Sequence, residues 1–240
     1  MRHHVPMAID PVPSTKKAPP PDWGLGEVPV PPVARVVGGA AAAVLLTAGA
    51  TALAAPIVGA GLGVAGLMAL ALWLSTRGRA LLRDSGGRRL GLDEAPRFDH
   101  LAAGLAADLG IDKPQLWIVP EGGPNAFVAW RGGAHVGITR SLLDGYARTE
   151  LEAVLAHCLV RIQTGEARAT TLSLGLGHVG ARIGGALDVA AAAMTRYPPA
   201  LASAVARAEP RGGRFAAAWF VGKDPTHVSP AERVAFLEDL

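Results

Sequence analysis

One helical segment of the 240-residue sequence brings together residue types that could do chemistry. Apolar residues at 151, 154, 155, 158, 159 and 162 follow helical spacing and predict a helix with one buried stripe. Glu150, His157 and Arg161 fall on a flank of this helix, and Cys158 lies near the centre of the stripe. Histidine and cysteine can bind zinc, but catalytic zinc needs three protein ligands and an open position. A cysteine inside an apolar stripe is more typical of a buried structural thiol.

The elements around this helix predict a folded domain over residues 77–240. Strands are expected at 115–119, 125–130 and 135–139, and the last two are joined by a turn rich in glycine. A helix is expected over 98–109 with Gly110 as its C-cap, and Ser141 could cap a further short helix. The apolar segment 169–181 is too short to cross a bilayer.

The excess of apolar residues lies in one stretch. The chain is 50% hydrophobic and 18% charged, yet residues 36–76 contain no charged residue and no histidine. This length fits two membrane crossings, which we expect at about 36–55 and 57–75, with a buried hairpin of a soluble protein as the alternative. Gly59 and Gly63 would allow the two helices to pack closely.

The flanks of this stretch give its orientation. Basic residues before it and an arginine cluster that begins at Arg77 predict that both termini are cytoplasmic, and the cluster would lie against anionic headgroups. Residues 1–35 hold nine of the 19 prolines and are expected to be a disordered cytoplasmic tail, either a spacer or a ligand of a proline-recognising domain. The single cysteine excludes a disulfide framework, and a net charge of +3 gives no reason to expect nucleic-acid binding.

Several motifs in a fixed order resemble the HtpX-type membrane zinc metallopeptidases. They are Pro124-Asn125-Ala126-Phe127, the segments 110–114, 136–139, 142–143 and 150–157, Asp188 with 190–191 and 197–204, and Thr226-His227 with 229–234. The resemblance implies an α+β fold, in which an N-terminal transmembrane helical hairpin precedes a mainly helical metallopeptidase-like domain with a small antiparallel sheet. It also implies an integral protein of a bacterial inner or plasma membrane, and a peptide-binding strand at Asn125, Ala126 and Phe127.

The metal site departs from the pattern of this family. In an HExxH helix, two histidines one turn apart bind zinc and the glutamate activates the bound water. The five positions here are His157-Cys158-Leu159-Val160-Arg161, so His157 is the only retained ligand and Cys158 stands at the general-base position. Arginine cannot ligate a metal. The family's third ligand would fall four residues before Asp188, which is Gly184.

These losses predict that no cofactor is bound and that no catalytic residue is in place. Zinc remains the alternative if Cys158, or His178 from the following segment, completes a non-standard site. Arg161 would occupy roughly the place of the metal cation, and an ion pair with Asp188 is therefore predicted, with a solvent-exposed arginine as the alternative.

The remaining polar residues of the motifs are expected to be structural. Glu150 and Asp188 would support the site, His227 and Arg233 would stabilise the start of the last helix, and Ser229 with Glu232 would form a capping box. The two histidines without partners at ligand spacing, His100 and His135, are expected at the surface.

Three functions follow from this reading. The first is a membrane-anchored pseudoprotease that binds peptides or proteins without hydrolysis. The second is an active zinc endopeptidase with non-standard ligands that degrades membrane or misfolded proteins. The third is a membrane scaffold that acts through the Pro-rich tail. The expected partners are thus the lipid bilayer and a peptide or protein.

Overall fold

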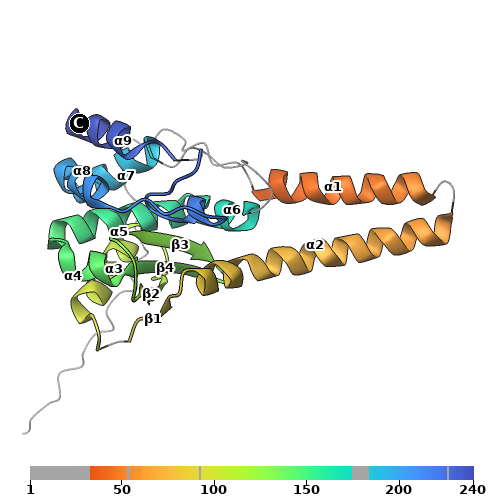
Figure 1. Ribbon diagram of the computed structural model, residues 1–240, viewed down its shortest axis with the longest axis horizontal. Coiled ribbons are helices and arrows are strands. Elements are labelled where there is room, and N and C mark those ends of the chain that lie inside the picture. Colours follow the sequence, from red (N-terminus) through yellow and green to blue (C-terminus); the bar gives the residue numbers. More distant parts are fainter. Residues whose placement is uncertain (1–32, 53–54, 92, 175–183, 226) are drawn as a thin grey trace, which may run out of the picture.

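The computed structural model describes residues 33–52, 55–91, 93–174, 184–225 and 227–240. It consists of a long helical hairpin that projects from an α+β domain (Figure 1). The predictions for the Pro-rich tail up to residue 32 and for His178 lie outside the described residues.

The hairpin is formed by α1 (Val33–Ala52) and α2 (Pro56–Asp84), which lie side by side (Figure 1). A Cβ atom added to Gly66 would lie 2.7 Å from Cγ1 of Val44, and one added to Gly63 would lie 3.2 Å from Cβ of Ala48. Close approach therefore depends on these two glycines, of which the sequence predicted Gly63. Within α2, the segment Ala60–Asp84 is long and apolar enough to cross a membrane.

The sheet has four strands in the order β1-β2-β4-β3, namely β1 (Arg88–Arg89), β2 (Gln115–Val119), β3 (Ala126–Trp130) and β4 (Ala134–Thr139). The prediction of an antiparallel sheet is wrong in one respect, because β2 and β4 pair in parallel. The hairpin of β3 and β4 places its second strand, not its first, beside β2, and the second strand runs in the direction of β2. The sheet is therefore mixed.

Seven further α-helices and a short 3-10 helix surround the sheet within the described residues. They are α3 (Pro96–Asp108), α4 (Arg140–Gly145), α5 (Arg148–Gln163), α6 (Glu166–Ser173), α7 (Ala186–Thr195), α8 (Pro198–Arg207), η1 (Ala216–Ala218) and α9 (Pro230–Glu238). The cap of α4 is Thr139, whose hydroxyl accepts a hydrogen bond from the Leu142 amide, and not Ser141 as predicted.

Helix α5 lies at the centre of the domain. It packs against α3, α6, α7, α8 and β3, and every residue from Ala153 to Ile162 is buried. The sequence predicted one buried stripe and a neighbouring polar flank, but neighbours on several sides enclose this flank as well. His157 and Arg161 therefore lie in the interior of the protein, where each polar group needs a partner.

The root of the hairpin forms part of a second apolar core. Helix α2 continues past its predicted end at residue 75, and Leu81 and Leu82 are buried with Phe127, Phe215 and Trp219. A Cβ atom added to Gly78 would lie 2.4 Å from the carbonyl oxygen of Trp130. The helix that carries the apolar span thus ends inside the domain, and no separate linker joins the two.

Candidate functional site

His157, the retained ligand position, belongs to a buried cluster of three charged or polar side chains from three helices. Its Nδ1 atom lies 3.1 Å from Oδ1 of Asp188 in the first turn of α7. Arg233 of α9 donates two hydrogen bonds to the same carboxylate, at 2.8 Å from Nε and 2.7 Å from Nη2. It also donates to the carbonyl of Phe220 at 2.8 Å. The cluster therefore joins α5, α7 and α9.

Burial and the neighbouring charges determine the protonation states of His157 and Asp188. Burial lowers the pKa of His157 to about 4 against the opposite effect of Asp188, so the ring is neutral near pH 7. Burial alone would raise the pKa of Asp188, but Arg233 and His157 together hold it well below its ordinary value. Asp188 and Arg233 thus form an ion pair beside an uncharged imidazole.

Both ring nitrogens of His157 are buried without a hydrogen bond to the described part of the chain, although Nδ1 lies close to the Asp188 carboxylate. A histidine with a carboxylate near one ring nitrogen and a free second nitrogen has the arrangement of a metal ligand. His157 and Asp188 therefore retain this arrangement, and the other ligand positions decide whether a metal can bind.

Arg161 fills the second ligand position with a fully bonded guanidinium. Its Nε and Nη2 atoms donate to the carboxylate of Glu166 in α6, with a distance of 3.2 Å for the Nη2 bond. Nη1 donates to the carbonyls of Ala218 and Trp219 at 3.2 Å, and Nη2 donates to Ala217 at 2.9 Å. All five N–H groups have acceptors, so the side chain is buried without an unsatisfied donor.

The predicted ion pair between Arg161 and Asp188 is therefore wrong, and so is the exposed alternative. Among the described side chains, Asp188 contacts His157 and Arg233, whereas Arg161 pairs with Glu166. Glu166 also accepts a hydrogen bond from the hydroxyl of Thr170. The charged partner of Arg161 lies only five residues along the chain, because α6 turns back beside the end of α5.

The third ligand position is lost in the backbone as well as in the side chain. A ligand four residues before Asp188 shares a helical face with it only if the helix includes both residues. Here α7 begins at Ala186, and Gly184 lies outside it with a φ of +121°. A side chain at Gly184 would be strained, and its Cβ would lie 3.0 Å from Cβ of Val228.

Cys158, at the general-base position, is buried, and burial raises the pKa of its thiol to about 12. The thiol is therefore protonated near pH 7 and supplies neither a base nor a thiolate ligand. Within the described ranges, no three His, Cys, Asp or Glu side chains gather closely enough to hold a metal ion. These residues do not fit a zinc site.

The chain itself covers the predicted peptide strand. Asn125, Ala126 and Phe127 are fully buried. The Phe220 amide donates to the Ala126 carbonyl at 2.7 Å, and Phe127 forms an antiparallel bridge with Trp219. The Asn125 amide nitrogen donates to the carbonyls of Glu209 and Val221 at 2.7 and 2.8 Å. The free edge of β3 is thus paired with residues 219–221.

Glu150 and His100 are placed as predicted, whereas His135 is not. Glu150 accepts hydrogen bonds from the Ala147 amide, Ser203 and Arg207, and so fixes the start of α5 against α8. His100 is exposed as predicted. His135 was expected at the surface but is buried, because Trp117 on the neighbouring strand donates to its Nδ1 at 3.0 Å.

The predictions for the start of the last helix are confirmed. Ser229 and Glu232 form the capping box of α9. His227 is buried with Nε2 2.9 Å from the carbonyl oxygen of Trp219, and Arg233 is the structural partner of Asp188. The pairing of Arg233 with Asp188 was not predicted, because Asp188 lies on α7, far away in the sequence.

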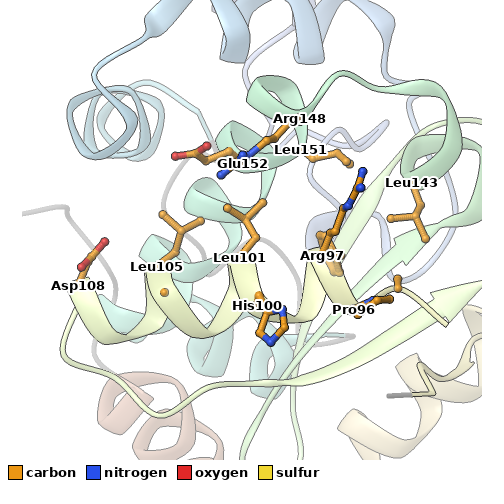
Figure 2. A pocket seen from close by; sticks show the side chains of 13 residues that line it. Pro96, Arg97, His100, Leu101, Leu105, Asp108, Leu143, Arg148, Leu151 and Glu152 are labelled. Atoms are coloured by element: carbon orange, nitrogen blue, oxygen red, sulfur yellow. The ribbon is translucent and has the colours of Figure 1, made fainter. Parts of the chain in front are cut away.

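A groove of about 910 Å³ lies between α3 and α5. Leu101, Leu105 and Leu151 point into it (Figure 2), and its other labelled lining residues include Arg97, His100, Asp108, Arg148 and Glu152. None of the residues at the former ligand positions lines this groove, so it is distinct from the His157 cluster.

Comparison with known proteins agrees with the order of these elements. Residues 93–206, which contain α3 to α7 and most of α8, match the model of peptidase family M48. This part of the chain belongs to family M48. The chain is 33% identical over 113 residues to "Protease HtpX homolog" of Aquifex aeolicus, a match that spans 46% of this chain and 37% of the relative.

Two further relatives carry the same name. The Thermococcus sibiricus protein is 41% identical over 83 residues, 34% of this chain and 28% of its own length. The Tropheryma whipplei protein is 32% identical over 101 residues, 41% of this chain and 35% of its own length. The chain therefore matches about a third of the length of these relatives. No solved structure matches it.

Sequence reasoning identified His157, Arg161, Gly184 and Asp188 as the informative positions but missed Glu166, the acidic partner of Arg161. A glutamate five residues after a buried arginine is the one signal that could have indicated it. The carbonyls of residues 217–219 carry no such signal, because every residue has one.

Proposed function

We propose that this chain is a membrane-anchored pseudoprotease of family M48, which acts by binding a peptide or protein and does not hydrolyse it. The anchor is the hairpin of α1 and α2, with the M48 domain on the cytoplasmic side of a bacterial inner or plasma membrane. No cofactor takes part in this function.

The observation that carries the proposal is the complete bonding of Arg161. Its five N–H groups are all accepted by Glu166 and by three backbone carbonyls, so the second ligand position is filled by a fixed cation. A zinc ion near this position would be repelled by the guanidinium, which cannot deprotonate. The strained backbone at Gly184 and the neutral thiol of Cys158 support the same conclusion.

The mode of binding is proposed from the groove between α3 and α5. Because residues 219–221 occupy the edge of β3, a peptide cannot add to the sheet there unless these residues leave. The groove combines leucine side chains with charges of both signs at its rim, a composition suited to an amphipathic segment of a partner. It is therefore the candidate binding surface.

Membrane anchoring is proposed from the exposure of the hairpin. Leu46, Leu62, Val64, Met68 and Leu72 are each more than half exposed, which would be unfavourable in water. In lipid these side chains would contact acyl chains, and the helical backbone would satisfy its own hydrogen bonds.

The first experiment is metal analysis of the purified full chain after expression in zinc-rich medium. We expect far less than one zinc ion per chain, and no change in His157→Ala. One zinc per chain that is lost in His157→Ala would overturn the proposal in favour of an endopeptidase with non-standard ligands. Casein cleavage that a chelator abolishes would have the same consequence.

The second experiment is photo-crosslinking in cells with a photoreactive residue at Leu101 in the groove, and with one at the exposed Lys223 outside the groove as the control. We expect protein adducts at position 101 that persist when residues 1–32 are deleted. If that deletion removes all adducts, the scaffold that acts through the Pro-rich tail replaces the binding proposal.

A further inference from the structure

The face of the domain at the root of the hairpin combines arginines with aromatic rings. Large side chains of α2 are exposed up to Leu72, at 66%, and its leucines are buried from Leu81 onward. Between these limits, the guanidinium carbon of Arg77 lies 3.6 Å from the ring centroid of Trp73. Stacked tryptophan and arginine side chains are typical of the boundary between acyl chains and headgroups.

Residues far away in the sequence join this boundary. The turn between β3 and β4 touches α2, because a Cβ added to Gly78 would lie 2.8 Å from Cβ of Arg131. The Trp130 amide donates to Thr171 of α6 at 3.0 Å, and the guanidinium carbon of Arg168 lies 5.7 Å from the Trp130 ring centroid. The turn and α6 thus bring two exposed arginines to the hairpin root.

A fourth segment, residues 211–215, completes the set. Arg214 pairs with Asp84 at the end of α2 at 3.2 Å, and its guanidinium carbon lies 4.6 Å above the ring of Phe215. Phe215 is itself buried against the last turn of α2. We call this set the arginine collar, and its members are Trp73, Arg77, Trp130, Arg131, Arg168 and Arg214.

The charge of this region has one sign. Residues 73–84, 130–133, 166–173 and 211–215 contain seven arginines and two acidic residues. One of these acids, Glu166, is buried against Arg161, and the other, Asp84, is paired with Arg214. Arg88, which the sequence also assigned to the membrane surface, instead bonds to Glu94 at 2.7 Å. The exposed face of the collar is therefore basic.

We propose that the arginine collar docks the M48 domain on the anionic headgroups of the bilayer that α2 crosses. This inference rests on the proposed membrane anchor. The hairpin of α1 and α2 sets the depth of the protein but does not by itself set the tilt of the whole molecule against the bilayer. Arginines from α2, the turn between β3 and β4, α6 and residues 211–215 would hold one face of the domain against anionic lipid.

The test uses the full chain in nanodiscs of phosphatidylcholine alone or with phosphatidylglycerol, followed by hydrogen exchange at residues 130–133. We expect hydrogen exchange at these residues to be slower by about fivefold or more in the anionic discs, which is the effect of one arginine that contacts anionic headgroups. This difference should decrease at high salt. Arg131→Gln with Arg168→Gln should abolish the difference. The matched control is Arg97→Gln with Arg148→Gln at the groove, which should retain it.

Equal exchange in both kinds of disc, or a difference that survives in the collar variant, would overturn the collar. If inorganic phosphate gives the wild-type chain in detergent the same protection, a free-anion site replaces the bilayer. If the chain does not co-elute with nanodiscs, the proposed membrane anchor is wrong. If the chain co-elutes but exchange is equal in both kinds of disc, only the collar is wrong and the anchor stands. Thermal unfolding in detergent checks that both double variants are folded.

Discussion

Two buried arginines lie near the former metal centre, and they differ in what their clusters leave unsatisfied. Arg161 places all its donors on Glu166 and three carbonyls, so its cluster is closed. Arg233 is also fully buried and pairs with Asp188, but both ring nitrogens of the adjacent His157 lack a hydrogen bond within the described residues. The first cluster has no donor left over, whereas the second retains the arrangement of a histidine that could bind a ligand.

The difference teaches how a metal site can be lost without loss of the fold. A zinc ion connects helices by directional bonds, and a guanidinium offers five such bonds in a fixed plane. Arg161 uses them to tie α5 to α6 and to residues 217–219, next to the segment that covers β3. Arg161 thus links α5 to α6 and to residues 217–219, whereas the third ligand position lies beside α7.

The largest expected effect is that of Arg161→Met. This change leaves the Glu166 carboxylate and three carbonyls buried without their donor, and we expect a loss of about 4 kcal/mol in the free energy of unfolding. Urea unfolding of the full chain in detergent measures it. The double variant with Glu166→Met should recover part of this loss, and a double variant that is less stable by the sum of the two single effects would contradict the pairing.

A somewhat smaller effect is expected for Asp188→Asn. The change leaves Arg233 without a charged partner in the interior, although the Phe220 carbonyl remains bonded, and we expect a loss of about 3 kcal/mol. The same unfolding measurement applies. If Asp188→Asn lowers the free energy of unfolding by less than the loss of the partly exposed pair of Arg207 and Glu150, the Arg233 cluster does not stabilise the contact between the helices.

The next effect is a pH dependence of the free energy of unfolding, which we expect from His157 in the Arg233 cluster. The pKa of His157 is about 4 in the folded chain, and that of an unfolded histidine is about 6.5. Between these values the unfolded state binds the extra proton, so stability falls as the pH is lowered, by about 2 kcal/mol from pH 7 to pH 5. Unfolding curves at these two pH values test this, and His157→Gln should lose most of the dependence. An unchanged slope in that variant would exclude His157 as its source.

The smallest effect is expected at the partly exposed pair of Arg207 and Glu150. The Arg207 side chain is 46% exposed, so water screens the pair, and Arg207→Gln should reduce stability less than each of the preceding changes. Thermal unfolding measures the shift. A loss as large as that of Arg161→Met would mean that burial does not explain the difference between these ion pairs.

Much of the fold could be predicted locally. The strand Gln115–Val119 has the predicted bounds, the turn at 131–133 joins an antiparallel pair, and the capping box of α9 is present. Each of these depends on neighbours within a few residues. The parallel pairing of β2 with β4 was missed, because strand order depends on contacts between segments far apart in the sequence.

The sequence by itself determined which chemistry is missing from the M48 domain. His157, Cys158, Arg161 and Gly184 can be read by position, and the types of these side chains alone remove two ligands and the base. Only the tertiary structure decided what replaced them. The periodicity of α5 placed Arg161 on a polar flank, but several elements pack around this helix and bury the side chain. The partners of Arg161 are the acceptors that this packing brings within hydrogen-bond distance of it. Residue type is local, whereas burial and hydrogen-bond partners depend on the packing of the whole chain.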